Sequence, residues 1–188
     1  RYKGALDREA TRQNNQAAVA YQKIANSALT QADFDAQNSA IAAQFPLATV
    51  TGATSEQSAF FTERMGNITE QQTAKAKNAL NTAASRASSL ANYNAMVEGI
   101  QAEYPDLNIG AAFALDANLM LKGRLRREAE RAALAGVKTV ENEEQWQALR
   151  AEMVRLFGAN FPAQAESNDF DFLDQAFAQK ELMFEKSL

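Results

Sequence analysis

A short basic run is the most chemically suggestive feature of the sequence. Its members are Lys122, Arg124, Arg126 and Arg127. Arg131 follows about one helical turn later. Such a row of cations could contact phosphates, an anionic membrane surface or a protein partner. The alternative is a solvated helix face that is partly paired with Glu128 and Glu130. Because no aromatic residue interleaves the run, the solvated face is the favoured interpretation.

Acidic residues gather near the C-terminus. They are Glu166, Asp169, Asp171 and Asp174. Carboxylate oxygens are typical ligands of Ca²⁺, but the order of an EF-hand loop and its turn glycine are missing. Acidic side chains are also favoured at helix N-termini, where they interact with the helix dipole. We therefore interpret this cluster as a helix start and predict no metal site.

The remaining polar residues form no recognisable catalytic set. Four carboxylates could in principle pair for acid–base chemistry, but their spacing places no two across a cleft. They are Glu56, Glu63, Glu70 and Glu103. The chain has no histidine and no cysteine, which removes the commonest general base and thiolate chemistry. Neither a nucleophile elbow nor a glycine-rich phosphate loop is present. We expect a non-catalytic protein with no cofactor and no small-molecule substrate.

Aromatic residues concentrate in the C-terminal third, as Phe157, Phe161, Phe170, Phe172, Phe177 and Phe184. Together with the pair Phe60-Phe61, they could form a groove for a ligand or a partner helix. More often such residues are the large members of a core that alanine alone cannot fill. Tyr93 and Trp146 are expected in the core or at its rim.

The composition indicates which elements position these residues. Alanine occurs 39 times, against 6 valines and 5 isoleucines. Alanine has the highest helix propensity, whereas β-branched residues favour strands. With only 8 glycines and 3 prolines, the chain lacks the turn signals of a sandwich or barrel. The sequence therefore predicts an all-α fold.

Apolar spacing and capping residues predict the helix boundaries. The expected helices cover residues 3–29, a shorter stretch from Thr30 to Pro46, about 55–103, about 109–135, about 141–157, and a last helix capped by Ser167. Asn108 is the expected cap of the fourth helix. The segment 46–54 is expected to be a loop, and Gly66-Asn67 could interrupt the long helix.

These elements suggest an elongated antiparallel bundle of four to six helices. No internal repeat is evident. We expect one helical domain over 1–188, with a long-helix bundle over 1–136 and shorter aromatic-rich helices over 137–188.

The net charge and the hydropathy limit the classes of partner that we expect for this chain. The net charge of −4 argues against nucleic-acid binding. No apolar run approaches the about 20 residues that a membrane span requires. Because the chain starts at Arg1 without an initiator methionine, we expect it to be processed or to be part of a longer protein, with any membrane anchor outside this sequence.

Three short stretches form a recognisable series. They are Arg1-Tyr2-Lys3-Gly4, the segment from Pro46 to Ala53 with Glu56 after it, and the segment from Tyr104 to Asn108 with Phe113 after it. In this order they resemble segments of the LemA family of bacterial membrane-associated helical proteins. The family's histidine is absent here, and the C-terminal third has no counterpart. The resemblance implies a helical domain with a single-span anchor, located in the bacterial cell envelope, and no catalytic residues.

Three functions remain open. The first is a membrane-anchored interaction or scaffold domain that binds protein partners or itself. The second is an internal, ejection or scaffolding protein of a bacteriophage virion, since long alanine-rich helices suit copies that bury their faces against each other. The third is a helical sensor ectodomain.

Overall fold

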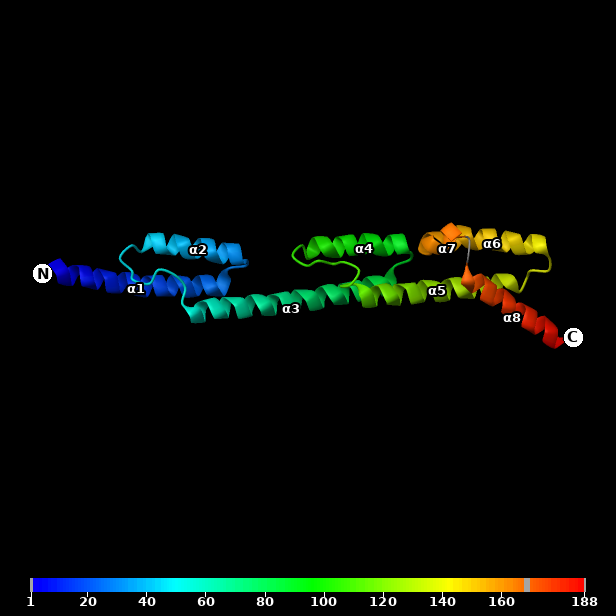
Figure 1. Cartoon of the computed structure of the whole chain (residues 1–188), viewed down its shortest axis with the longest axis horizontal. Coiled ribbons are helices and arrows are strands. Elements are labelled where there is room, and N and C mark those ends of the chain that lie inside the picture. The colour runs from blue at the N-terminus through cyan, green and yellow to red at the C-terminus, as the bar shows by residue number, and fades with distance from the viewer. Residues whose placement is uncertain (1, 168–169, 188) are drawn as a thin grey trace. The chain divides into compact units, whose positions relative to one another are not determined.

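The computed structural model describes residues 2–167 and 170–187, and within these ranges all regular structure is helical (Figure 1). The helices are α1 (Tyr2–Ser27), α2 (Gln31–Gln44), α3 (Ser55–Arg86), α4 (Leu90–Glu103), α5 (Leu115–Val137), α6 (Glu143–Phe157), the 3-10 helix η1 (Gly158–Asn160), α7 (Pro162–Ser167) and α8 (Asp171–Ser187). The predicted all-α fold is confirmed. The described part holds eight α-helices, more than the four to six expected.

The chain divides into two compact units, residues 1–72 and residues 73–188. The border therefore falls inside α3. The expected single domain over 1–188, with a long-helix bundle over 1–136 and shorter helices over 137–188, stays a prediction. Each unit is described by itself below.

Unit 1 is built on the hairpin of α1 and α2. A short connection reverses the chain, and Thr30 accepts a hydrogen bond from the backbone N–H of Asp33 at 3.0 Å. This is the predicted helix cap, and it satisfies a backbone donor that the first turn leaves unpaired. The core consists of Ala17, Tyr21, Ile24, Ala25, Ala28, Phe34, Ile41 and Phe61.

The loop after α2 returns the chain to the start of α3. It occupies residues 45–54 and so includes the whole of the predicted loop, 46–54. Two side chains of α1 hold it: Gln13 accepts from the N–H of Leu47 at 2.9 Å, and Asn14 accepts from the N–H of Thr49 at 2.7 Å. The loop is thus tied to the hairpin at both contacts, which positions α3 for packing.

The first core of unit 2 contains the end of α3, α4 and the first half of α5. The predicted continuous helix over 55–103 is wrong, because α3 ends at Arg86 and α4 begins at Leu90. Ser89 accepts from the N–H of Asn92 at 3.0 Å, and Asn92 accepts from the N–H of Ser88 at 3.0 Å. This reciprocal cap starts a new helix. The backbone at Gly66-Asn67, which the sequence offers as an interruption, is helical.

The second core of unit 2 contains the second half of α5 together with α6 and α8. Its buried members are Ala129, Ala133, Val137, Met153, Phe170, Phe172, Leu173 and Ala176. The first half of α5 supplies Ala117, Leu121 and Leu125 to the other core. Phe161 packs against both cores. Asn160 in η1 accepts from the N–H of Leu90 at 2.9 Å, so η1 also caps α4.

Two predicted caps are wrong. α5 starts at Leu115 without a side-chain cap rather than after Asn108, because turns occupy the intervening residues. Ser167 ends α7, where its hydroxyl donates to the carbonyl of Ala163 at 3.0 Å, and α8 begins at Asp171.

The three cores use equivalent positions. In the first helix of each core, the equivalent buried sets are Ala17, Ala76 and Ala129; Tyr21, Leu80 and Ala133; and Ala25, Ala84 and Val137. Just after that helix, a fourth buried set follows: Ala28, Ala87 and Val140. The second helix continues the match with the caps Thr30, Ser89 and Asn142, then Phe34, Tyr93 and Trp146, then Ile41, Ile100 and Met153, and finally Phe45, Tyr104 and Phe157. No insertion interrupts these stretches. The expectation that the chain has no internal repeat is therefore wrong.

The repeat extends to the third helix of each core. The ring of Phe61 stacks on Phe34 with centroids 4.2 Å apart, and the ring of Phe177 lies 4.4 Å from Trp146. Leu121 is the buried residue of α5 at the matching place. One helical turn later stand Arg64, Arg124 and Lys180. Each core is therefore a hairpin covered by part of a following helix.

Candidate functional site

Arg124, a member of the predicted basic surface, has a structural partner. Its Nε donates to the carbonyl of Ala84 at 3.2 Å, and its Nη2 donates to the carbonyl of Ala87. These carbonyls lie in and just after the last turn of α3, where the helix leaves its acceptors unpaired and carries partial negative charge. The planar guanidinium matches two adjacent acceptors, which a lysine ammonium cannot do as well.

Unit 1 contains the same arrangement. Nε of Arg64 donates to the carbonyl of Ala25 at 3.0 Å, and its Nη2 donates to the carbonyl of Ala28. We call this contact, in either unit, an arginine cap. Sequence reasoning missed Arg64 completely, because an isolated arginine on a helix carries no local signal. The sequence signal that could have revealed it is the recurrence of Phe45-Pro46 as Tyr104-Pro105, since Arg64 and Arg124 follow these two prolines at nearly the same interval.

Arg126 is held within the second core of unit 2. Its Nε lies 2.7 Å from a carboxylate oxygen of Glu130, and its Nη1 lies 3.0 Å from one of Asp171. The hydrogen bonds to Asp171 and then Glu130 raise the pKa of Arg126 above its ordinary value. Arg126 thus joins α5 to the start of α8.

The predicted basic surface is therefore divided by the fold. Lys122 and Arg127 are exposed on α5, whereas Arg124 and Arg126 are half-buried and serve internal contacts. Arg131 is also exposed. The structure does not bring the four predicted cations together as one solvent-facing set.

The described residues of the predicted acidic cluster also have separate environments. Asp171 pairs with Arg126, and Asp174 lies 3.6 Å from Arg150. Both lie in the first turn of α8, in line with the predicted helix start. Glu166 is exposed, and Asp169 lies outside the described residues. Over the described ranges, no three acidic side chains meet in a way that could hold a metal ion.

The other carboxylates considered for catalysis are exposed. Glu56, Glu63 and Glu70 lie on α3, and Glu103 ends α4.

Most of the aromatic series belongs to the core of unit 2. Phe170 and Phe172 are buried with ring centroids 5.2 Å apart, and Phe161 lies 5.6 Å from Phe172. Phe157 packs at the edge of the same core. The side chain of Phe184 is outside the described part.

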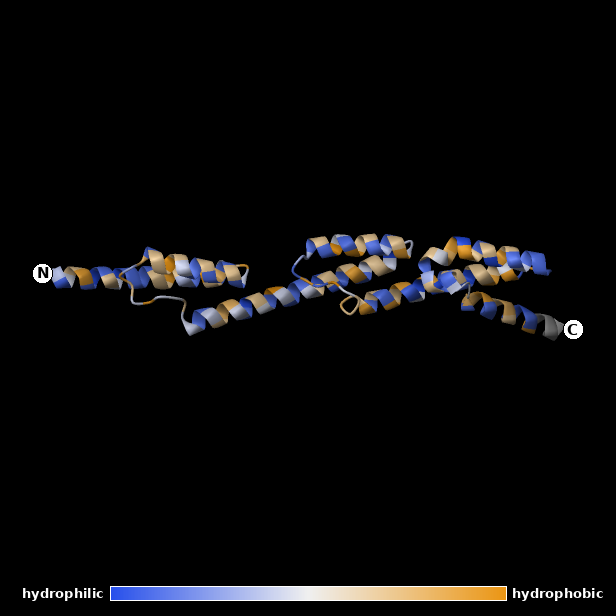
Figure 2. Ribbon diagram, turned by 45° about the horizontal axis from the view of Figure 1, so that its top comes forward, coloured by the Kyte–Doolittle hydropathy of each residue, from blue (hydrophilic) through white to orange (hydrophobic). Residues whose placement is uncertain are grey.

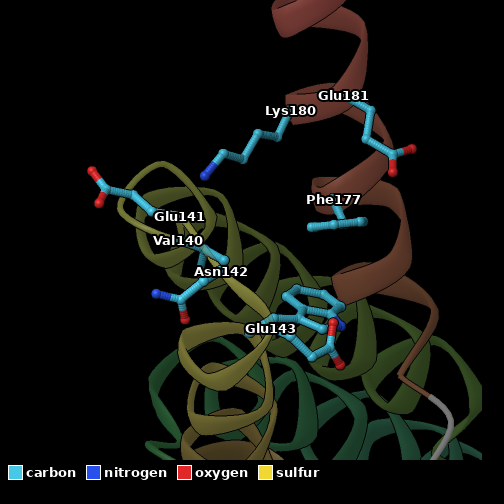
Figure 3. Close-up of a pocket in the computed structure, with 8 residues that line it drawn as sticks. Val140, Glu141, Asn142, Glu143, Phe177, Lys180 and Glu181 are labelled. Carbon is cyan, nitrogen blue, oxygen red and sulfur yellow. The ribbon is translucent and has the colours of Figure 1, made fainter.

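Trp146 and Phe177 have a second environment besides the core. They line an open cavity of about 270 Å³ between the α5–α6 connection and α8. The other lining residues are Val140, Glu141, Asn142, Glu143, Lys180 and Glu181 (Figure 3). This cavity is the strongest candidate for a binding site in the described chain, because it combines an apolar wall with charged groups at the rim.

The charges around this cavity are mainly negative. Glu141, Glu143 and Glu181 supply three carboxylates against the single ammonium of Lys180. Figure 3 shows Lys180 and Glu181 arriving from α8, with the ammonium of Lys180 on the side of Glu141. Outside the rim, Arg150 lies over the Trp146 ring at 5.7 Å. A cationic group would be favoured here over an anionic one.

Exposed apolar side chains mark a second candidate surface, on α5. Leu115 is 54% exposed and Leu119 is 59% exposed. They stand one turn apart on the same side of the helix. Figure 2 shows hydrophobic residues alternating with polar ones along α5. The pair does not contribute to either core of unit 2.

No protein-family model, curated protein or solved structure matches this chain. The resemblance to the LemA family therefore stays a prediction. Among the described residues, no helix combines the length and the apolar character needed to cross a membrane.

Proposed function

We propose that this chain is a non-catalytic helical scaffold that presents helix faces to protein partners. The observation that carries the proposal is the repeated core, in which a hairpin is covered by part of the next helix. Proteins built from repeated helical units commonly use their extended surfaces for binding. The polar residues with the best-defined contacts, Arg64, Arg124 and Arg126, serve this framework.

The exposed pair Leu115 and Leu119 supports the interaction role. Large apolar side chains on a helix face are used to anchor partner helices when they recur one turn apart. Lys122 is exposed nearby on the same helix and would add charge at the edge of such a contact. We propose this part of α5 as the contact surface.

Site-specific crosslinking tests the proposal. A photoreactive phenylalanine analogue replaces Leu119 in the protein expressed in its native cell, and the same analogue replaces Glu98, which is exposed on α4, as the control. We expect discrete adducts at position 119, to this chain or to another protein, that are absent at position 98. Equal labelling at both positions, or none, argues against the surface.

The cellular location follows as part of the same proposal. The resemblance to the LemA family favours association with the bacterial envelope through an anchor outside this sequence, and a virion location is the alternative. Fractionation of the complete gene product distinguishes them, since an anchored protein stays with membranes after a salt wash.

A further inference from the structure

One face of α3 carries a row of unpaired carboxylates. Glu56, Glu63 and Glu70 recur every seven residues, so they lie along one side of the helix over about 21 Å. All three side chains are exposed, and none has an ion-pair partner among the described residues. The buried Phe61 marks the opposite side of the helix, which faces the core of unit 1. We call these three glutamates the acidic row.

Phe60 stands within the acidic row, between Glu56 and Glu63. Its side chain is 46% exposed and does not belong to the core of unit 1. Covering the ring would remove apolar surface from water, which is favourable. The row therefore offers an apolar contact beside its charges.

The solvent-facing side of α5 carries the opposite charge. Arg127, Arg131 and Lys138 are exposed and follow one another at intervals of four and seven residues, which place them on one side of the helix. Over the described part of the chain, none of the three forms an ion pair. The half-buried Leu134 lies on the same side. Glu128 is also exposed, but it lies about a quarter turn away from Arg127. We call the three cations the basic row.

Antiparallel packing of two helices brings the charges of these rows into register. When Glu63 faces Arg131, Glu56 faces Lys138, because each lies seven residues from the central pair. Opposite charges attract across such a contact, whereas two acidic rows would repel each other. The charges therefore fit a contact between one row of each kind.

The apolar residues favour the same orientation. With Glu63 against Arg131 in an antiparallel pair, Phe60 meets Leu134, since each is three residues from the centre. Parallel packing would place Phe60 against Glu128 instead. An exposed ring gains more from a leucine than from a solvated carboxylate.

We propose that copies of this chain associate through the acidic row of one molecule and the basic row of its partner, with the two helices antiparallel. Each molecule carries both rows, so the contact is heterologous. The proposal rests on the scaffold role and names one partner for it, but the contact uses neither Leu115 nor Leu119. Crosslinking at Leu119 can therefore succeed with another protein while this association fails.

Sedimentation equilibrium of the complete chain tests the association. We expect the average mass to rise with protein concentration between about 10 µM and about 1 mM in low salt. Salt at about 0.5 M should weaken the association at least about five-fold, because ions screen exposed charges. A chain that stays monomeric in low salt, or an association that salt leaves unchanged, would overturn the proposal.

Charge reversal locates the contact. Glu63→Lys and Arg131→Glu each place like charges at its centre and should each weaken association about five-fold or more. The double variant exchanges the two charges and should restore association to within about two-fold of the parent. Glu98→Lys and Arg8→Glu change the net charge equally at exposed positions outside both rows and serve as controls. Equal losses in the controls, or no recovery in the double variant, contradict the assigned pair.

Phe60→Ser tests the register without a change of charge. Because the ring is largely exposed, the fold should persist, which circular dichroism shows, while association weakens about five-fold. Unchanged association contradicts the antiparallel register. If the chain stays monomeric but binds phosphatidylglycerol vesicles, and Arg131→Glu abolishes that binding, the basic row contacts a membrane and the proposal is wrong.

Discussion

The guanidinium of Arg124 lies against the carbonyl of Ala84, with Nε and the oxygen 3.2 Å apart. A second donor of the same group reaches the carbonyl of Ala87, which follows the end of α3. One side chain of α5 thereby satisfies acceptors that α3 cannot pair by itself. Arg64 does the same for the end of α1.

We predict that Arg124→Ala lowers the free energy of unfolding of unit 2 by about 2–3 kcal/mol, because two charge-assisted hydrogen bonds are lost and the carbonyls stay half-buried. Arg124→Lys should cost about 1 kcal/mol, since the charge remains but the fork is lost. Urea unfolding followed by Trp146 fluorescence measures both. Arg127→Ala, at an exposed position, is the control and should stay within about 0.5 kcal/mol of the parent. An Arg124→Ala cost as small as the control would contradict the cap.

Tyr21 and Tyr93 should respond to removal of their hydroxyls in opposite directions. Tyr21 is fully buried, and its hydroxyl has no hydrogen-bond partner among the described residues. Tyr93 donates to Oδ1 of Asn118 at 2.8 Å. We expect Tyr21→Phe to stabilise the chain by about 1 kcal/mol and Tyr93→Phe to destabilise it by about 1 kcal/mol. Chemical denaturation followed by circular dichroism gives both values. Stabilisation by both changes would show that the Tyr93 bond contributes nothing.

Alkaline pH should weaken the fold through the same two tyrosines. Burial raises the pKa of Tyr21 and of Tyr93 above the ordinary value of 10.0. The unfolded chain therefore loses these protons more easily than the folded chain. Stability is fully present below the unfolded pKa near 10 and falls as the pH rises through the higher folded values. The free energy of unfolding measured from pH 8 to pH 11 tests this, and the double variant Tyr21→Phe, Tyr93→Phe should show a shallower decline.

Gly66→Ala tests whether α3 continues without a break through Gly66-Asn67. A Cβ at Gly66 would meet no atom within 4 Å. In a continuous helix the change should stabilise the chain by about 1 kcal/mol, because alanine has the higher helix propensity. Gly136→Ala is the matched variant, since its Cβ would clash with Cδ1 of Leu149, and the clash should offset the gain. Thermal unfolding of the two variants gives the comparison. A neutral or destabilising Gly66→Ala would indicate a break.

Local rules predicted much of the helical structure. Thr30 was recognisable as a cap because its hydroxyl and Asp33 have the standard spacing. Pro46 was recognisable as the end of a helix for steric reasons. The cap at Ser89 is not predicted, because the apolar spacing continues across it and periodicity alone favours one long helix.

The repeat and the cavity beside Trp146 could not be predicted in this way. Equivalent positions of the repeat hold chemically different residues, such as Tyr21, Leu80 and Ala133. Each core needs a side chain of a different volume at the same place. The spacing of equivalent residues also differs, because it is shorter from the second core to the third than from the first core to the second. The cavity forms where Val140 and Trp146 come to lie beside Phe177 of α8, which the sequence places far apart.

The division of α5 between two cores affects how such a chain can change during evolution. Leu121 belongs to one core and Val137 to the other, although both lie on one uninterrupted helix. If one core were deleted as a set of whole helices, the deletion of α5 would therefore also remove part of the neighbouring core. A gene duplication that preserves both cores must begin and end within helices. The joints between ancestral copies are then expected in the middle of α5 rather than in its flanking loops.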